Sequence, residues 1–461
     1  MKSIAFIDTE IEPKSKKLLD LGAVKGDGQQ FHKNTPADFT AFLRGCEFVA
    51  GHNIIKHDLN FAGRAVAEAG IPHANAIDTL YWSPLLFPTH PYHALLKDDK
   101  LQTDEMNNPL NDAIKAKDLF FDEVTAFWAL EPAMQQIFYG LLHRQREFEA
   151  FFRFLGFSAA VTDLEQLICQ TFADEICEHA HLNHFISEQP IALAYSLSLL
   201  HTFIKHRQIH SITPPWVLKN YPDVERILLR LRNQPCVTGC AYCHQALDVH
   251  RALSRFFGYE GFRSYGGEPL QERAVTAAVN NQSMLAIFPT GGGKSITFQL
   301  PALMSGEAAK GLTVVISPLQ SLMKDQVDNL EKAGITAAVT INGLLDPIER
   351  AKSFELVEDG SASLLYISPE SLRSKTIERL LLGRKVVRFV IDEAHCFSAW
   401  GQDFRVDYLY IGDFIKRLQE LKNQEECIPV SCFTATAKPK VIDDIRAYFR
   451  EKLALELQLF T

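Results

Sequence analysis

The segment at 284–303, MLAIFPTGGGKSITFQLPAL, constrains the fold of this chain more than any other stretch. An apolar run typical of a buried strand leads into three consecutive glycines, after which Lys294 and Ser295 open an amphipathic helix. Glycines let backbone N–H groups turn towards an anion, and the amino end of a helix attracts negative charge. We therefore expect a phosphate-binding loop between a strand and a helix.

The residue types in this loop suit ATP with a divalent cation. Backbone N–H groups can surround the phosphate oxygens, Lys294 can place its ammonium against the β- and γ-phosphates, and the Ser295 hydroxyl can bind Mg²⁺. Phe288 stands where the G-x-x-x-x-G-K-S pattern has its first glycine. A turn that only caps a helix would leave Lys294 and Ser295 without a role. The predicted phosphate-loop residues are Thr290, Gly291, Gly292, Gly293, Lys294 and Ser295.

Four further apolar runs, LTVVIS, SLLYIS, VVRFVID and PVSCFT, alternate with helical segments. This alternation predicts a doubly wound parallel sheet, and so an α/β domain, over residues 251–461. The run VVRFVID ends in Asp392, and Glu393 follows it. An aspartate at that strand end can hold the metal ion, and the adjacent glutamate can orient or deprotonate an attacking water.

The motifs SPLQSLMKDQV, YISPESL, DEAHCFSAWGQDFR and FTATA follow the phosphate loop in the order and spacing of the first motor lobe of RecQ-family helicases in superfamily 2. Residues 251–461 resemble that RecA-like lobe, which implies binding of ATP and DNA. The resemblance implies that adenine is recognised by Tyr259, Arg263 and Gln271, although the stretch between Arg263 and Gln271 is longer than the family's common arrangement. It also implies that nucleotide state is relayed by His395, Thr434 and Thr436.

The same resemblance implies a track for single-stranded DNA. Bases stack on aromatic side chains and arginine pairs with phosphate in such tracks. Because the formal net charge of the chain is -9, DNA contact must come from a local groove. The implied DNA-binding residues are Ser317, Pro318, Ser368, Trp400, Phe404 and Arg405. The alternative is that Trp400 and Phe404 are core residues.

Residues 1–118 predict a second α/β domain with an acidic site. The run SIAFIDTE places Asp8 and Glu10 at alternate strand positions, so both carboxylates point to one face. Later segments add Asp58 and Asp112. Four carboxylates can hold two Mg²⁺ or Mn²⁺ ions that activate water for phosphodiester cleavage. The segment resembles DnaQ-like 3′–5′ exonucleases of the DEDD superfamily, which implies an RNase H-like fold.

The general base of that family is missing from its usual positions. The family has a His five residues, or a Tyr four residues, before the last aspartate, whereas this chain has Asn107 and Asn108. An asparagine side chain takes up no proton at neutral pH. His57, beside Asp58, is a possible substitute. Three interpretations stay open: an active nuclease, a slow metal-binding domain, and a nucleic-acid-docking relic.

The middle of the chain predicts a helical connector and then a small metal site. Residues 119–233 carry Phe, Trp and Leu at three- and four-residue spacing. The following segment, 234–250, contains CVTGCAYCH, in which three thiolates and one imidazole could form a tetrahedral zinc site. An iron–sulfur cluster and ordinary buried cysteines are the alternatives. The candidate ligands are Cys236, Cys240, Cys243, His244 and His250.

Together these patterns predict an ATP-dependent DNA helicase of RecQ type with a 3′–5′ exonuclease-like domain, acting on single-stranded or forked DNA in repair, recombination or defence. The alternative is a non-catalytic scaffold that binds nucleic acid. Without a leader or a long apolar run, we expect a cytoplasmic protein with no membrane segment. Since only a helix and the start of a strand follow FTATA, we expect the second motor lobe to lie in a longer chain or a separate polypeptide.

Overall fold

The structure of the protein is a computed structural model with two compact units. Unit 1 comprises Met1–Thr171 and Leu182–His201, and unit 2 comprises Phe172–His181 and Thr202–Thr461. None of the helices in the described part of the chain combines the length and apolarity of a membrane span. The described residues are 2–12, 14–90, 93, 108–205, 212–289, 291–398, 405–424, 426–435 and 438–461.

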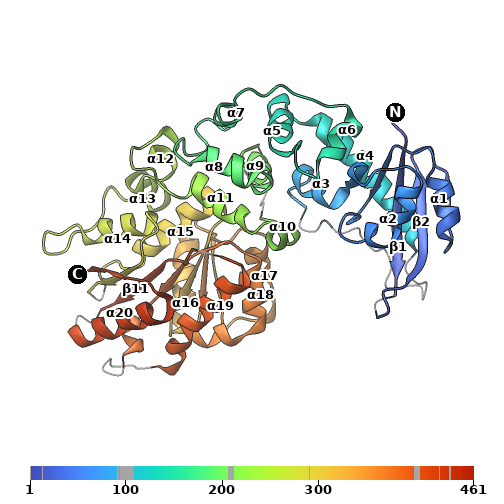
Figure 1. The fold of residues 1–461 in the computed structure, drawn as a ribbon. Coiled ribbons are helices and arrows are strands. Elements are labelled where there is room, and N and C mark those ends of the chain that lie inside the picture. Colours follow the sequence, from blue (N-terminus) through green and yellow to red (C-terminus); the bar gives the residue numbers. More distant parts are fainter. Residues whose placement is uncertain are drawn as a thin grey trace. The chain divides into compact units, whose positions relative to one another are not determined.

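Unit 1 is built on a five-stranded mixed sheet with the order β3-β2-β1-β4-β5 (Figure 1). Its central strand β1 (Ile4–Ile11) pairs antiparallel with β2 (Leu18–Lys25) and parallel with β4 (Phe48–Gly51). The edges are β3 (Gln30–His32) and β5 (Ala76–Asp78). The first residues of β1 are buried apolar side chains, so this strand anchors the core of the unit.

The long helix α4 (Pro109–Ala129) packs against β1 and β2. Gly22 on β2 permits this approach, because a Cβ there would lie 2.2 Å from the backbone nitrogen of Leu110. The helix continues through the predicted domain boundary at residue 118, and residues 119–171 belong to unit 1. The other helices up to residue 205 are α1 (Pro36–Leu43), α2 (Leu59–Glu68), α3 (Thr79–Leu86), α5 (Pro132–Leu142), α6 (Glu149–Leu155), α7 (Leu164–Thr171), α8 (Leu182–Glu188) and α9 (Pro190–Lys205).

The long segment of unit 2, Thr202–Thr461, contains several short helices followed by a seven-stranded sheet. Every strand pair of that sheet is parallel, in the order β12-β6-β11-β10-β7-β9-β8. The short helices are α10 (Pro215–Asn220), α11 (Asp223–Arg232), α12 (Ala241–Ala246) and α13 (Val249–Phe257). The strands are β6 (Met284–Ile287), β7 (Leu312–Ile316), β8 (Ala338–Ile341), β9 (Leu364–Ile367), β10 (Val386–Ile391), β11 (Val430–Thr434) and β12 (Gln458–Phe460).

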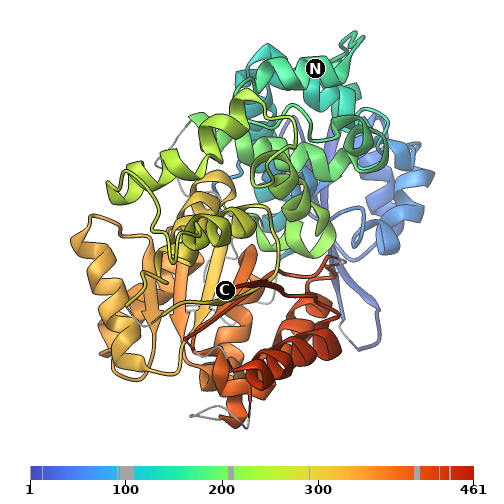
Figure 2. The ribbon, with the colours of Figure 1, turned by 90° about the vertical axis from the view of Figure 1, so that its left-hand side faces the viewer.

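Helices cover both faces of the parallel sheet, each face with its own apolar core (Figure 2). This doubly wound α/β arrangement agrees with the fold class expected for residues 251–461. One face is covered by α14 (Leu270–Val279), α15 (Ile296–Ala309) and α16 (Gln320–Lys332). The other is covered by α17 (Pro347–Glu358), α18 (Lys375–Leu382), α19 (Ile411–Leu421) and α20 (Pro439–Leu453).

A buried arginine ties the centre of this sheet to α14. Arg388 on β10 is 4% exposed, and its guanidinium donates to the carbonyls of Ala278 and Gln282 and to the Ser431 hydroxyl at 2.8–2.9 Å. Burial lowers the pKa of Arg388 to about 9. Arg388 thus satisfies, from inside the core, the carbonyls near the end of α14 and before β6 and the Ser431 hydroxyl on β11.

We predict that Arg388→Ala lowers the free energy of unfolding by about 2–5 kcal/mol, because it leaves a cavity and three buried acceptors without a donor. Urea denaturation followed by circular dichroism measures this change. Arg379→Ala, at an exposed position on α18, is the matched control and should change stability by less than about 0.5 kcal/mol. Equal stability of the two variants would contradict the structural role of Arg388.

Candidate functional site

The phosphate loop joins the carboxyl end of β6 to the start of α15. Gly291 and Gly293 have φ of 75° and 64°, in the left-handed region that disfavours side chains. At Gly292 a Cβ would lie 2.7 Å from the Pro289 carbonyl oxygen. The three glycines are therefore required by the path of the backbone. Thr290 lies outside the described residues.

Lys294 of this loop reaches the acidic pair that follows β10. Its Nζ lies 2.5 Å from Asp392 Oδ1 and 3.3 Å from Glu393 Oε1. Burial alone would lower the pKa of Lys294, but the attraction of Asp392 and then of Glu393 outweighs it and raises the pKa. Asp392 is fixed through its backbone, whose N–H donates to Ile316 O and whose carbonyl accepts from the Tyr408 hydroxyl. The structure thus brings together the predicted lysine and both predicted acids.

Glu393 has a strained, left-handed backbone conformation, and its side chain contacts neighbouring residues. Its φ is 51°, which costs a residue with a side chain on the order of 1–3 kcal/mol. His395 Nδ1 lies 3.2 Å from Glu393 Oε2 and 3.3 Å from Thr434 Oγ1 at the end of β11. The bond from His395, followed by the charge of Lys294, lowers the pKa of Glu393 to about 2. Glu393 is therefore a carboxylate at neutral pH, connected through His395 to a second strand. Thr436, the third predicted relay residue, lies outside the described residues.

Gln271 links the predicted adenine segment to the phosphate loop. Its Oε1 accepts from Arg263 N at 2.8 Å, and its Nε2 donates to Gly293 O at 2.9 Å. Tyr259 stands apart from these bonds: it is 54% exposed, and its ring stacks on Phe257 with 6.2 Å between centroids.

Tyr265 contacts the loop without having been predicted from the sequence. Its hydroxyl donates to Gly292 O, and its ring meets Phe288 edge-on at 5.6 Å between centroids. It lies in the longer stretch between Arg263 and Gln271. An aromatic residue beside the glycine pair at 266–267 was the available signal.

The predicted DNA-binding residues that the structure describes follow the carboxyl ends of neighbouring strands. Ser317 and Pro318 follow β7, and Ser368 follows β9, with its Oγ 3.0 Å from Ser371 Oγ. Arg405 extends an Nη1 donor to Pro318 O at 3.5 Å. These residues therefore share the sheet edge that carries the phosphate loop. The remaining two predicted residues, Trp400 and Phe404, lie outside the described residues.

A separate acidic cluster lies in unit 1. Carboxylate oxygens of Asp8, Glu10 and Asp112 all lie within 4.8 Å of one another, a grouping that could hold a metal ion. Alternation along β1 supplies the first two acids, and the first turn of α4 supplies Asp112. Asp58 is outside this group. It is buried, and its Oδ1 accepts from Thr9 N at 2.9 Å and from Thr9 Oγ1 at 2.7 Å.

Asn108, at one of the two positions expected for a general base, caps a helix instead. The side chain of Asn108 caps α4, accepting from Leu110 N at 3.0 Å and from Asn111 N at 3.4 Å. Asn107 lies outside the described residues. His57 is half-exposed, with Nδ1 3.5 Å from Asp58 Oδ1, and that bond raises the pKa of His57.

Cysteines also gather in unit 2, with a member that the sequence did not suggest. Ligand atoms of Cys177, His179, Cys236 and Cys240 all lie within 4.8 Å of one another. Cys243 lies next to this group: its backbone N–H donates to Cys240 Sγ at 3.5 Å, and its thiol interacts with those of Cys240 and Cys177. The predicted ligands His244 and His250 are not in this group. His250 Nε2 instead lies 2.9 Å from Glu272 Oε1 on α14.

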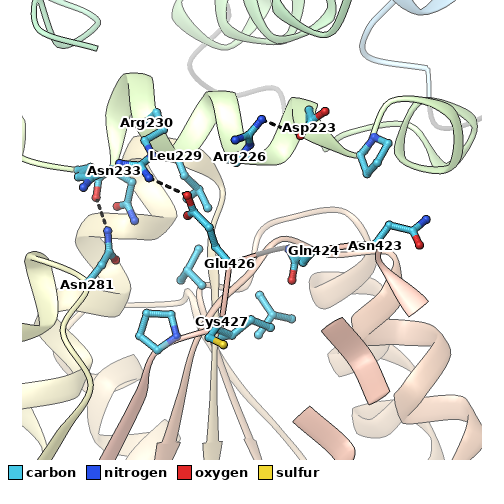
Figure 3. A pocket seen from close by; sticks show the side chains of 16 residues that line it. Asp223, Arg226, Leu229, Arg230, Asn233, Asn281, Asn423, Gln424, Glu426 and Cys427 are labelled. Carbon is cyan, nitrogen blue, oxygen red and sulfur yellow. Dashed lines mark hydrogen bonds and ion pairs between the residues drawn. The ribbon is translucent and has the colours of Figure 1, made fainter. Parts of the chain in front are cut away.

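A cavity of about 430 Å³ lies at the opposite end of the parallel sheet from the phosphate loop (Figure 3). It is lined by residues of α11, by the start of β10 and by the segment before β11. Its charged groups pair with one another: Arg230 Nη2 lies 2.7 Å from Glu426 Oε1, and Arg226 Nη2 lies 2.9 Å from Asp223 Oδ1. This pairing leaves the cavity without a net charge that would select a nucleotide.

Comparisons with known proteins agree with the site in unit 2. Residues 268–445 match the family model described as DEAD/DEAH box helicase. A relative named ATP-dependent DNA helicase RecQ, from Bacillus subtilis, is 46% identical over 200 residues, which are 43% of this chain and 31% of that protein. The ATP-dependent helicase SGS1 of Saccharomyces cerevisiae is 40% identical over 193 residues, which are 41% of this chain and 13% of that protein.

Residues 268–445 are therefore similar to a DEAD/DEAH box helicase domain, a type of domain that supports ATP hydrolysis, and the matched relatives are named ATP-dependent helicases. The parallel sheet of unit 2 is typical of RecA-like helicase lobes. The chain spans about a third or less of the length of these relatives. Among solved structures, the DUF1998 helicase MrfA bound to DNA overlaps with a TM-score of 0.37 at 18% identity, covering 50% of this chain and 30% of that one, a likeness too low to carry an argument.

We predict that Gln271→Ala weakens ATP binding about tenfold, because it removes two hydrogen bonds, each worth about 0.5–1.5 kcal/mol, that position the loop and the Arg263 segment. Titration with ATP and Mg²⁺ in a calorimeter measures the change. Gln166→Ala, an exposed glutamine on α7, is the control and should bind ATP like the unmodified chain. Unchanged affinity in Gln271→Ala would remove this residue from the nucleotide site.

Proposed function

We propose that residues 251–461 form the first motor lobe of a RecQ-type, ATP-dependent DNA helicase. The observation that carries the proposal is the meeting of Lys294 with Asp392 and Glu393 beside a glycine loop. The helicase names of the relatives support the same function.

In this proposal each group of the site has one task. The loop N–H groups and Lys294 bind the phosphates of ATP, while Ser295 and Asp392 hold Mg²⁺. Glu393 is ionised and accepts a proton from, or orients, the attacking water. His395 carries the state of the site to Thr434 on β11.

The proposed polymer substrate is DNA with a single-stranded or forked region. Pro318, Ser368 and Arg405 lie past the carboxyl ends of the strands, on the edge that also holds ATP, so binding of one ligand can affect the other. We propose Trp400 and Phe404 as the stacking residues of this track.

We further propose that unwinding needs a second motor lobe, in this polypeptide's longer form or in a separate one. The described residues contain one parallel sheet and one phosphate loop. A second lobe would supply the arginine that neutralises the transferring phosphoryl group, a contribution of about 10³ to 10⁵ in rate.

We predict that the purified chain binds ATP with Mg²⁺, hydrolyses it slowly and does not separate a DNA fork alone. Lys294→Ala should abolish binding, whereas Glu393→Gln should keep binding and lower hydrolysis at least about 10²-fold. Equilibrium binding and single-turnover hydrolysis separate the two effects, with exposed Lys332→Ala as control. Rapid fork unwinding by the chain alone would contradict the need for a second lobe. ATP binding by Lys294→Ala equal to that of the control would contradict the site itself.

A second proposed function is 3′–5′ exonuclease activity in unit 1. The specific observation is the convergence of Asp8, Glu10 and Asp112, which suits one or two divalent cations, with Asp58 beside them through Thr9. The sheet order with β1 at its centre supports the RNase H-like fold expected from the sequence. With an asparagine as the α4 cap, we propose a slow nuclease; a docking domain without catalysis is the alternative.

We predict weak shortening of labelled single-stranded DNA from its 3′ end in Mn²⁺, stronger than in Mg²⁺, and its loss in Asp8→Asn. Asp38→Asn, an exposed acid on α1, is the control because it keeps the same charge change away from the cluster. Gel analysis of 3′- and 5′-labelled strands gives the polarity. Identical traces for Asp8→Asn and Asp38→Asn would leave unit 1 as a docking domain.

A further inference from the structure

We propose that Cys177, Cys236, Cys240 and Cys243 bind one structural zinc ion that fastens the segment Phe172–His181 to the cysteine loop. The proposal concerns a metal site separate from the ATP site and from the acidic cluster. It therefore stands or falls independently of the proposed catalytic functions.

The cysteines of the cluster come from two distant parts of the chain. Cys177 precedes Cys236 by 59 residues (236 minus 177), yet their ligand atoms lie within 4.8 Å of each other and of Cys240. The thiol of Cys243 interacts with those of Cys177 and Cys240. All four cysteines are free thiols in the structure, so no disulfide accounts for the cluster.

Hydrogen bonds hold the Cys177 segment close to the segment that carries the other three cysteines. Cys177 N donates to Leu231 O at 2.8 Å, and Arg232 reaches Glu175 with bonds of 2.6 Å to its carbonyl and 3.0 Å to its carboxylate. The Tyr242 hydroxyl donates to Arg232 O at 2.7 Å. Arg232 thus connects the Cys177 segment to the helix that carries Cys243.

The region around the cysteine loop has little regular secondary structure to keep it folded. Residues 233–240 contain no helix or strand, and α12 has six residues. Segments this short rarely hold their shape through an apolar core, and a tetrahedral metal site provides the missing constraint. Zinc binding would then contribute folding free energy to this part of unit 2.

The spacing of the donors favours a single ion over an iron–sulfur cluster. A zinc–sulfur bond of about 2.3 Å sets the thiolates of a tetrahedral site about 3.8 Å apart. The sulfur atoms of Cys177, Cys236 and Cys240 lie within 4.8 Å of one another, which is close to that value. A four-iron cluster needs wider spacing, because each cysteine binds a different iron.

A fifth donor, His179, lies beside the four thiols but is assigned outside the zinc. It is exposed, and its ring nitrogens lie 3.4 Å from the Thr238 hydroxyl, whereas Cys243 is buried like Cys177 and Cys240. A ring in that position can bond to ligand sulfur or to the loop without replacing a thiolate.

Metal analysis of the purified full chain tests the assignment. We expect about one zinc per chain, retained in His244→Ala, in His179→Ala and in Cys427→Ser, an exposed cysteine outside the cluster. Cys177→Ser should lose most of its zinc when dialysed against a mild chelator. Iron with sulfide, the absence of metal, or full zinc in Cys177→Ser with loss in His244→Ala would overturn the proposal.

Cobalt substitution provides a second readout if Cys177→Ser fails to fold. The cobalt-loaded chain should show the absorption of a tetrahedral thiolate site, and Cys177→His should bind cobalt with weaker thiolate-to-cobalt absorption. An identical spectrum in Cys177→His would exclude Cys177 from the metal. A spectrum changed by His179→Ala and unchanged by Cys243→Ser would overturn the four-cysteine assignment.

Discussion

The pairing of Lys294 with Asp392 and Glu393 is the interaction on which the motor site depends. Three largely buried charges would be costly to desolvate if they were kept for stability alone. The burial of these charges is explained if Lys294 serves to bind phosphate and the two acids serve to bind a metal ion. It also requires β6, β10 and β11 to end at the same edge, so the whole parallel sheet serves to align these few atoms.

In unit 1 the acidic cluster is formed by a strand and a helix that pack together. The central strand places Asp8 and Glu10 on one face, and the contact between Gly22 and the start of α4 brings Asp112 to them. Thr9, between the two acids of the strand, is bound by Asp58. A change at Gly22 would therefore disturb the cluster without touching a carboxylate. In unit 1 two of the acids lie on the strand itself, whereas in unit 2 the charged residues follow the ends of the strands.

The sequence was most informative where structure follows from neighbouring residues. The glycine loop, the strand before it and the acids after VVRFVID are local patterns, and the doubly wound sheet followed from their alternation with helices. The strand β8 escaped prediction because it has only four residues and lies at a sheet edge. Cys177 could not be assigned to the cysteine loop, because its place depends on packing between distant segments. Tyr265 is likewise placed by a contact between segments, its hydrogen bond to Gly292 O.

A crystal structure of the chain with a non-hydrolysable ATP analogue and Mg²⁺ tests the central claim most directly. We expect the triphosphate in the 288–295 loop, Lys294 Nζ moved from Asp392 to the phosphates, and the metal ion bound by Ser295 and Asp392. The distance between Lys294 Nζ and Asp392 Oδ1, which is 2.5 Å in the present structure, should lengthen. A nucleotide bound elsewhere, or a Lys294–Asp392 pair unchanged beside a bound triphosphate, would contradict this account.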